Sequence, residues 1–166
     1  MIKKLLISTV AVAALSTSAM ADKYASAGLA LENLNGYDMG FALVLDGGMT
    51  FDDVKVGPGK LAAEGEFTYS MVAPSVSGVD ASLMTLGAYA AYIFDINKQF
   101  YVKPRVGLIY KSIDYGTWIG SISEIGLALG VGGGYKLNKQ MDIYADFNLI
   151  DGTDITHLTA GVQYHF

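Results

Sequence analysis

Cysteine is absent from the 166-residue chain, which excludes a disulfide framework and any thiolate metal site. Basic runs are absent as well: 11 Lys and Arg residues stand against 16 Asp and Glu residues, and the net charge is −5. Because nucleic-acid surfaces depend on clustered positive charge, this balance excludes nucleic acid as a partner. The chain is therefore expected to fold without cross-links and to work away from nucleic acid.

Long apolar runs are also missing beyond the first 21 residues, although 52% of the chain is hydrophobic and its mean hydropathy is +0.36. The longest apolar stretches, around 86–94 and 125–135, are short and rich in glycine, whereas a membrane-spanning helix needs about 20 apolar residues. Apolar and polar residues instead alternate along most of the chain, as they do in β-strands with two different faces. Such strands suit a transmembrane β-barrel, in which one face meets lipid and the other meets the lumen.

The first 21 residues have the three parts of a secretory signal peptide. Lys3 and Lys4 supply a positive start, a short apolar core follows, and small residues at 19–21 precede a cleavage site. The core is too short for a membrane anchor. We therefore expect residues 1–21 to be removed and residues 22–166 to form one barrel domain with nine basic and 16 acidic residues, a net charge of −7.

Eight alternating segments follow, separated by turn residues. Two turns nearly repeat one another, DINKQFYV at 95–102 and KLNKQMDIY at 136–144, and they suit the short periplasmic turns of a barrel. The connection at 46–60 is long for such a turn, and either an extended hairpin or a loose loop fits it. We predict an all-β fold, an eight-stranded antiparallel up-and-down transmembrane β-barrel, with strands near 23–32, 38–46, 61–73, 83–96, 100–113, 123–137, 141–150 and 156–166.

Charged residues within these segments share one face. Between Leu61 and Met71, every second residue is apolar, aromatic or glycine, and Glu64 and Glu66 lie between them. A charge facing lipid at mid-depth would cost roughly 2–4 kcal/mol, so the charged faces are expected to line the lumen. Lys103 and Arg105 are then predicted to pair with some of Glu64, Glu66 and Glu124. The candidate lumen charge network is Glu64, Glu66, Lys103, Arg105, Glu124 and Asp146.

These lumenal charges have two interpretations. One is an ion pathway or a charged gate, and the other is a plug of paired charges that fills a narrow barrel. We favour the plug, because eight strands leave an interior just wide enough for side chains. Glycines at 126, 130, 132 and 134 share the lumenal face and would make room for larger neighbours.

Aromatic residues gather at both ends of the predicted strands, as in the two girdles that mark the interfaces of a membrane barrel. Tyr37 and Tyr115 fall in the outer group. Pro104 stands in mid-strand, where a bulge would accommodate its missing N–H. The candidate girdle residues are Tyr92, Phe94, Tyr110, Trp118 and Tyr135.

The last residues, GVQYHF, place Val162, Tyr164 and Phe166 at alternate positions. This stretch, the eight alternating segments and GLALGVGGGYKLNKQMDIYADF at 126–147 resemble the small eight-stranded outer-membrane barrels, the OmpA/OmpX-like or porin-family proteins. The resemblance implies the outer membrane of a Gram-negative cell, contact with its lipid and lipopolysaccharide, and a structural or surface-interaction role toward an unknown surface ligand. It also implies that Val162, Tyr164 and Phe166 form the signal that the barrel-assembly machinery recognises.

Three other functions stay open. A small porin-like channel is suggested by the family but opposed by the strand count. A lipid A-modifying enzyme is opposed at His157 and Thr159, because threonine replaces the serine of a His-x-Ser pair and no orienting acid follows. A soluble lipocalin-like binder would show the same alternation with its two faces reversed.

No cofactor, metal or catalytic site is predicted. The two histidines, His157 and His165, lie on one predicted strand, where eight residues span about 26 Å. They cannot share a metal ion, and the glycine-rich stretch at 130–136 lies inside a strand pattern and not in a phosphate-binding loop.

Overall fold

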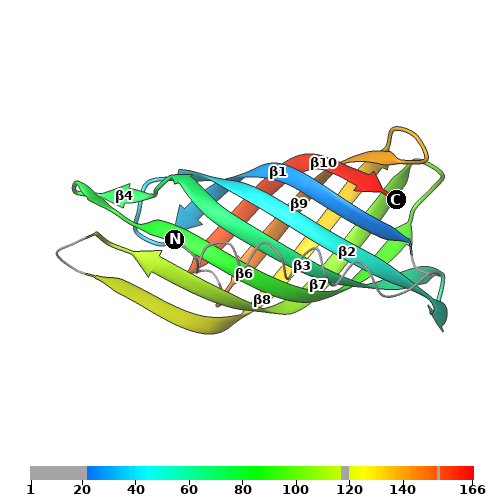
Figure 1. Cartoon of the computed structure of the whole chain (residues 1–166), viewed down its shortest axis with the longest axis horizontal. Coiled ribbons are helices and arrows are strands. Elements are labelled where there is room, and N and C mark those ends of the chain that lie inside the picture. Colours follow the sequence, from blue (N-terminus) through cyan, green and yellow to red (C-terminus); the bar gives the residue numbers. More distant parts are fainter. Residues whose placement is uncertain (1–21, 117–119, 153) are drawn as a thin grey trace.

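The structure is a computed structural model that describes residues 22–116, 120–152 and 154–166; the predicted signal peptide and Trp118 lie outside this part of the chain. Eight long strands form one closed antiparallel barrel, in which β1 pairs with both β2 and β10 (Figure 1). The predicted eight-stranded all-β barrel is confirmed. In the described ranges, no helix has the length and apolar character needed to cross a membrane. The long strands are β1 (Lys23–Leu34), β2 (Gly40–Val56), β3 (Gly59–Val72), β6 (Ser82–Asp95), β7 (Phe100–Asp114), β8 (Ser121–Lys136), β9 (Met141–Ile150) and β10 (Ile155–His165).

The short turns gather at one end of the barrel, together with both ends of the described chain. The Phe166 N–H donates to the Lys23 carbonyl at 2.9 Å, and the Lys136 N–H donates to the Gln99 carbonyl at 2.8 Å. This end, on the right in Figure 1, is termed the turn end. The opposite end carries the connections that follow β1, β3, β7 and β9 and is termed the loop end.

The long connection at 46–60 is an extended hairpin. Strand β2 continues to Val56, Gly57 turns the chain with φ of 65°, and β3 begins at Gly59. The Tyr92 hydroxyl donates to the Val56 carbonyl at 2.7 Å and accepts from the Gly59 N–H at 2.8 Å. One side chain of β6 therefore holds both sides of this turn.

A small hairpin that the sequence pattern does not predict extends the connection between β3 and β6. Strand β4 (Ser75–Val76) pairs with β5 (Val79–Asp80) across Ser77 and Gly78, which have φ of 51° and 82°. Two consecutive residues with positive φ are the signature of a tight type I′ hairpin turn. Strands of two residues are too short to produce a visible alternation, so the pattern at 74–80 indicates only a loop.

Pro104 interrupts the ladder without a bulge. Ala91 pairs with Arg105 and Phe94 pairs with Val102, so the β6–β7 register is the same on both sides of the proline. The two residue pairs between them are missing from the ladder, which agrees with the absence of an N–H on proline. The predicted bulge is therefore wrong. Strand β7 keeps its register with β6 and loses only two residue pairs beside the proline.

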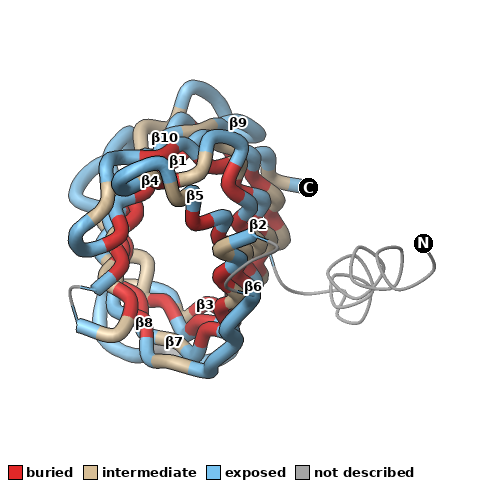
Figure 2. Tube along the Cα trace, turned by 90° about the vertical axis from the view of Figure 1, so that its left-hand side faces the viewer, coloured by how far each residue is buried: buried red, intermediate tan, exposed pale blue. Residues whose placement is uncertain are grey.

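The alternation of faces follows the expected phase. Figure 2 shows buried and exposed residues alternating along the barrel strands. On β3, Glu64 and Glu66 are buried, whereas Ala63 and Gly65 are exposed. The lumenal glycines make room as expected, because a Cβ on Gly132 would collide with the Asp146 carboxylate. Small residues on β8 thus face large polar ones from β9, as a filled barrel requires.

Replacing Gly132 with valine should destabilise the barrel, because the new side chain displaces the Asp146 carboxylate that it meets. Overpacking of this kind costs about 1–3 kcal/mol. Gly65→Val is the matched control, since Gly65 faces outward and a Cβ there meets nothing closer than a carbonyl oxygen at 4.0 Å. Urea unfolding of both refolded variants, followed by gel shift, checks this; equal midpoints would contradict the filled lumen.

Candidate functional site

Arg105 lies at the centre of a buried charge cluster that spans the lumen. Its guanidinium contacts four carboxylates from three other strands: Glu66 at 2.5 Å, Glu64 at 3.2 Å, Asp46 at 3.3 Å and Asp146 at 3.7 Å. All five side chains are at most 3% exposed. Arginine suits this position, because its planar, permanently charged fork reaches several acceptors at once.

Lys103 is the second cation of the cluster. Its ammonium lies 2.7 Å from Glu64 and 3.6 Å from Asp146. Tyr24 donates its hydroxyl to Glu64 at 2.6 Å, and the Arg105 guanidinium lies 4.4 Å from the centre of the Tyr89 ring. The lumen charge network therefore joins two cations and four carboxylates, with tyrosines closing its sides.

The composition of this network differs from the sequence-based expectation at two residues, Asp46 and Glu124. Asp46 is missed, because the expected strand ends there; the buried positions of β2 in fact continue past it through Gly48 and Thr50. Glu124 does not join the network. It lies at the loop end with its side chain 60% exposed and pairs with Lys111 at 3.3 Å.

The register of β7 and β8 explains the position of Glu124. Lys103 faces Gly132, whereas Glu124 faces Lys111. Eight residues of strand separate Gly132 from Glu124, which is roughly 26 Å. Alternation assigns Glu124 to the correct face but does not give its height along the barrel.

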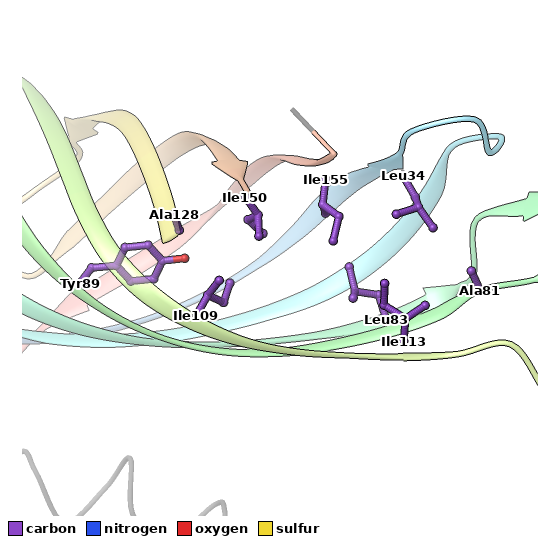
Figure 3. Packing of buried hydrophobic residues seen from close by; sticks show 9 residues of the cluster. All are labelled: Leu34, Ala81, Leu83, Tyr89, Ile109, Ile113, Ala128, Ile150 and Ile155. Carbon is purple, nitrogen blue, oxygen red and sulfur yellow. The ribbon is translucent and has the colours of Figure 1, made fainter. Parts of the chain in front are cut away.

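Apolar side chains fill the lumen at the loop end. Leu83, Ile109, Ile150 and Ile155 are at most 2% exposed although they lie on the inward face of their strands. Figure 3 shows these side chains converging from opposite walls. The apolar layer consists of Leu34, Ala81, Leu83, Tyr89, Ile109, Ile113, Ala128, Ile150 and Ile155.

Tyr37 and Tyr115 pack against this layer, and their ring centroids lie 6.5 Å apart. Partial burial raises the pKa of the Tyr115 hydroxyl above its usual value. Their expected place in the outer aromatic girdle is therefore wrong, because they pack against the side chains that fill the lumen.

A second group of buried polar side chains lies beside the apolar layer, where the Ser70 hydroxyl accepts from the Leu83 N–H at 2.9 Å. Ser70 donates to Glu32 at 2.7 Å, and the His157 ring lies 3.8 Å from the same carboxylate. Both ring nitrogens of His157 are buried without a hydrogen-bond partner in the described part of the chain. No group of three or more potential ligands that could hold a metal ion occurs within the described ranges.

The turn end of the lumen opens into a cavity of about 90 Å³. Lys103 and Tyr101 lie at its floor, and Asp142, which accepts from His165 at 2.9 Å, lines its wall. The lumen is therefore polar toward the turn end and apolar toward the loop end.

Aromatic side chains ring the outside of the barrel. Tyr110 is exposed near the loop end and Phe94 near the turn end, and Tyr135 packs on Phe100 with ring centroids 4.9 Å apart. Tyr92 also faces outward, but its hydroxyl holds the 56–59 turn. Trp118 lies outside the described residues.

Val162, Tyr164 and Phe166 point away from the lumen at the turn end. They are 44%, 42% and 75% exposed, and the rings of Tyr164 and Phe166 pack edge to face at 5.3 Å. These three side chains form a continuous apolar strip along the last part of β10 and the residue after it.

Replacing Arg105 with methionine should destabilise the barrel by about 3–5 kcal/mol, because it strips the cation from buried carboxylates. The loss should shrink as the pH falls, since protonated carboxyls no longer require a cation. Lys60→Met is the matched control: Lys60 pairs with Asp22 and Asp52 at the exposed turn end, where an ion pair contributes at most about 1 kcal/mol. Urea unfolding in lipid checks this, and equal losses would contradict a buried network.

Solved structures share this fold. The Ail protein of Yersinia pestis, solved with the heparin analogue sucrose octasulfate, superposes with a TM-score of 0.61 at 17% identity, covering 88% of this chain and 97% of Ail. Neisserial surface protein A gives a TM-score of 0.57 at 23% identity with the same coverage. The N-terminal barrel of Pseudomonas aeruginosa OprF gives 0.51 at 14% identity, covering 88% and 97%.

At these identities, the three structures show a common fold and nothing finer. Among the curated proteins, none matches the sequence. The family model for the outer membrane protein beta-barrel domain, in contrast, matches residues 5–166. The chain therefore belongs to the outer-membrane β-barrel family.

Proposed function

We propose that this protein is an integral barrel of the Gram-negative outer membrane that presents a surface for interaction and keeps its lumen closed. The observation that supports a closed lumen most strongly is its filling: buried ion pairs and an apolar layer follow one another along the axis. The barrel then acts as a scaffold that positions its loop end outside the cell.

The outer surface supports a position in lipid. Large apolar side chains face outward along the middle of the strands, including Leu108 at 60%, Leu127 at 63% and Leu129 at 58% exposure. Such a surface would be costly in water, since soluble proteins seldom expose a large contiguous apolar patch. A soluble lipocalin-like binder, with an apolar interior and a charged exterior, has the opposite arrangement. The expected partners of this surface are outer-membrane lipid and lipopolysaccharide.

The closed lumen is supported by the cost of moving an ion through it. An ion passing Arg105 would have to replace contacts to Glu64, Glu66 and Asp46 that are shielded from water. Beyond them it would meet a layer in which Leu34, Leu83, Ile109, Ile113, Ile150 and Ile155 present only hydrocarbon, where an isolated charge is strongly disfavoured. A porin-like channel is therefore the less favoured alternative.

The position of His157 and Thr159 argues against an enzyme. Both side chains face the lumen and are at most 2% exposed. A nucleophile acting on an acyl chain of lipid A would have to reach the membrane or the outer rim, and these side chains do not. We propose that the barrel has no catalytic activity.

A surface role agrees with the name of Ail, the attachment invasion locus protein. The ligand cannot be carried over, because the loop end here is acidic: Lys111 is its sole basic residue, and it is paired with Glu124 and Asp151. A sulfated polyanion like the sucrose octasulfate bound by Ail would be repelled. The acidic residues at this end are Asp38, Asp80, Asp114, Glu124, Asp151 and Asp154.

Single-channel conductance tests the closed lumen. The chain refolded without the predicted signal peptide should be silent in planar bilayers, in a preparation whose folding is shown by a heat-dependent gel shift. Steady, ion-selective steps would overturn the proposal, and Glu64, Glu66, Lys103 and Arg105 would become the selectivity candidates.

We also propose that the strip of Val162, Tyr164 and Phe166 is recognised by the barrel-assembly machinery. The strip faces outward, where another protein can reach it before the barrel meets lipid.

Replacing Phe166 with alanine should lower the amount of barrel inserted in cells severalfold and leave refolding into detergent nearly unchanged, because the residue is 75% exposed and its ring packs against Tyr164 at the surface. Quantifying the folded band in outer-membrane fractions, with Leu108→Ala as an outward-facing control, checks this. Equal losses in cells and in detergent would assign Phe166 a purely structural role.

A further inference from the structure

One edge of the barrel sheet is uncovered at the loop end. Strand β8 pairs with β7 along Ser121–Tyr135 but with β9 only from Ala128 to Lys136. The described part of the chain places no strand beside residues 121–126 on the β9 side. The segment is uncovered because β8 extends well past the end of β9 at Ile150. These six residues are termed the free edge.

The backbone groups that face the free edge can be assigned. The Leu127 carbonyl accepts from the Asp151 N–H at 2.9 Å, and the Leu127 N–H donates to the Asp151 carboxylate at 3.1 Å. Leu127 therefore directs both backbone groups toward the β9 side. Because this direction alternates along a strand, Ser121, Ser123 and Ile125 direct their N–H and C=O groups the same way. Ile122 and Glu124 direct theirs toward β7.

Exposed edges of this kind are templates for an added strand. Proteins commonly protect such edges with proline, a bulge or very short length. Residues 121–126 contain no proline, and their register with β7 is continuous. Ile125 is 75% exposed and Ile122 is 54% exposed, on opposite faces of the strand. The segment thus offers both main-chain partners and apolar contacts.

The charges around the free edge indicate which kind of strand could bind there. Glu124 lies within the edge, and Asp151 and Asp154 lie in the connection that follows β9, the side toward which the edge is open. The single lysine of this end is engaged with Glu124 and Asp151. An added strand would therefore lie between carboxylates, which favours lysine and arginine side chains and disfavours acidic ones.

We infer that the free edge of β8 binds an extended, basic polypeptide segment, which adds to the sheet as a strand beside residues 121–126. This inference rests on the proposed surface role and names the class of partner. Main-chain hydrogen bonds to Ser121, Ser123 and Ile125 would supply affinity. Carboxylates on both sides would supply the preference for charge.

Hydrogen exchange of the refolded barrel in zwitterionic lipid nanodiscs tests the edge directly. In the barrel alone, the amides of Ser121, Ser123 and Ile125 should exchange fast, and those of Ile122 and Glu124 should be protected. Addition of the capped hexapeptide Lys-Val-Lys-Val-Lys-Val should slow the first three. Protection of all five amides before the peptide is added would overturn the inference, because the edge would already be covered.

Binding of the same peptide separates strand addition from simple charge attraction. A version with every backbone nitrogen methylated keeps its charge but cannot donate main-chain hydrogen bonds from either edge, and it should bind at least about tenfold more weakly, as should an Asp-Val version. Equal binding of the methylated peptide would overturn the inference.

Two variants at Ser123 test whether peptide binding needs the backbone N–H of the free edge. Ser123→Pro removes an N–H that faces the open side, which an edge strand tolerates, and it should weaken binding about tenfold. Ser123→Ala keeps that N–H and should bind like the wild type. Equal binding by both variants would overturn the inference. Because peptide binding does not depend on conductance, its failure in a barrel that is silent in bilayers counts against the free edge alone.

Discussion

Closure of the hydrogen-bond ladder is the constraint on which the rest of the structure depends. In lipid, an unpaired backbone N–H or C=O costs several kcal/mol, so β1 must find β10 and leave no open edge at membrane depth. With eight strands, closure fixes a lumen about as wide as the side chains that line it. The interior must then be filled, and the glycines of β8 facing Asp146 and Asn148 show how closely it is filled.

The filling changes character along the axis because each level meets a different environment. Charged side chains in the middle are kept by mutual pairing around Arg105. Toward the loop end, Leu83, Ile109 and Ile155 fill the lumen by packing, and the ion pairs of Lys111 with Glu124 and Asp151 lie at the more exposed rim. Beyond the membrane the closure constraint is lifted, because water can satisfy backbone groups there. The uncovered part of β8 occurs at this end of the barrel.

Much of this arrangement could be predicted from the sequence, because a strand has only two faces. Alternation assigns Glu64, Lys103 and Arg105 to the same side of the sheet, and the strand count assigns them to a narrow lumen. Height along the barrel could not be predicted, since it depends on the register of pairs such as Lys103 with Gly132. That is why Glu124 is misplaced and why inward-facing isoleucines such as Ile109 and Ile155 escape notice. An apolar residue on the lumenal face suggests that the two faces of the strand were assigned the wrong way round, until the register is known.

Pro104 follows Lys103, a residue that lines the cavity at the turn end. The two missing pairs of the β6–β7 ladder are Tyr92 with Pro104 and Ile93 with Lys103, and Ile93, Tyr101 and Lys103 line the cavity. With the lumen closed as proposed, this cavity is a blind well that opens at the turn end and stops at its floor. Any voltage across the membrane would fall over the short dry segment between that floor and the outer mouth. The local electric field on Arg105 and its carboxylates would then exceed the average field across the bilayer.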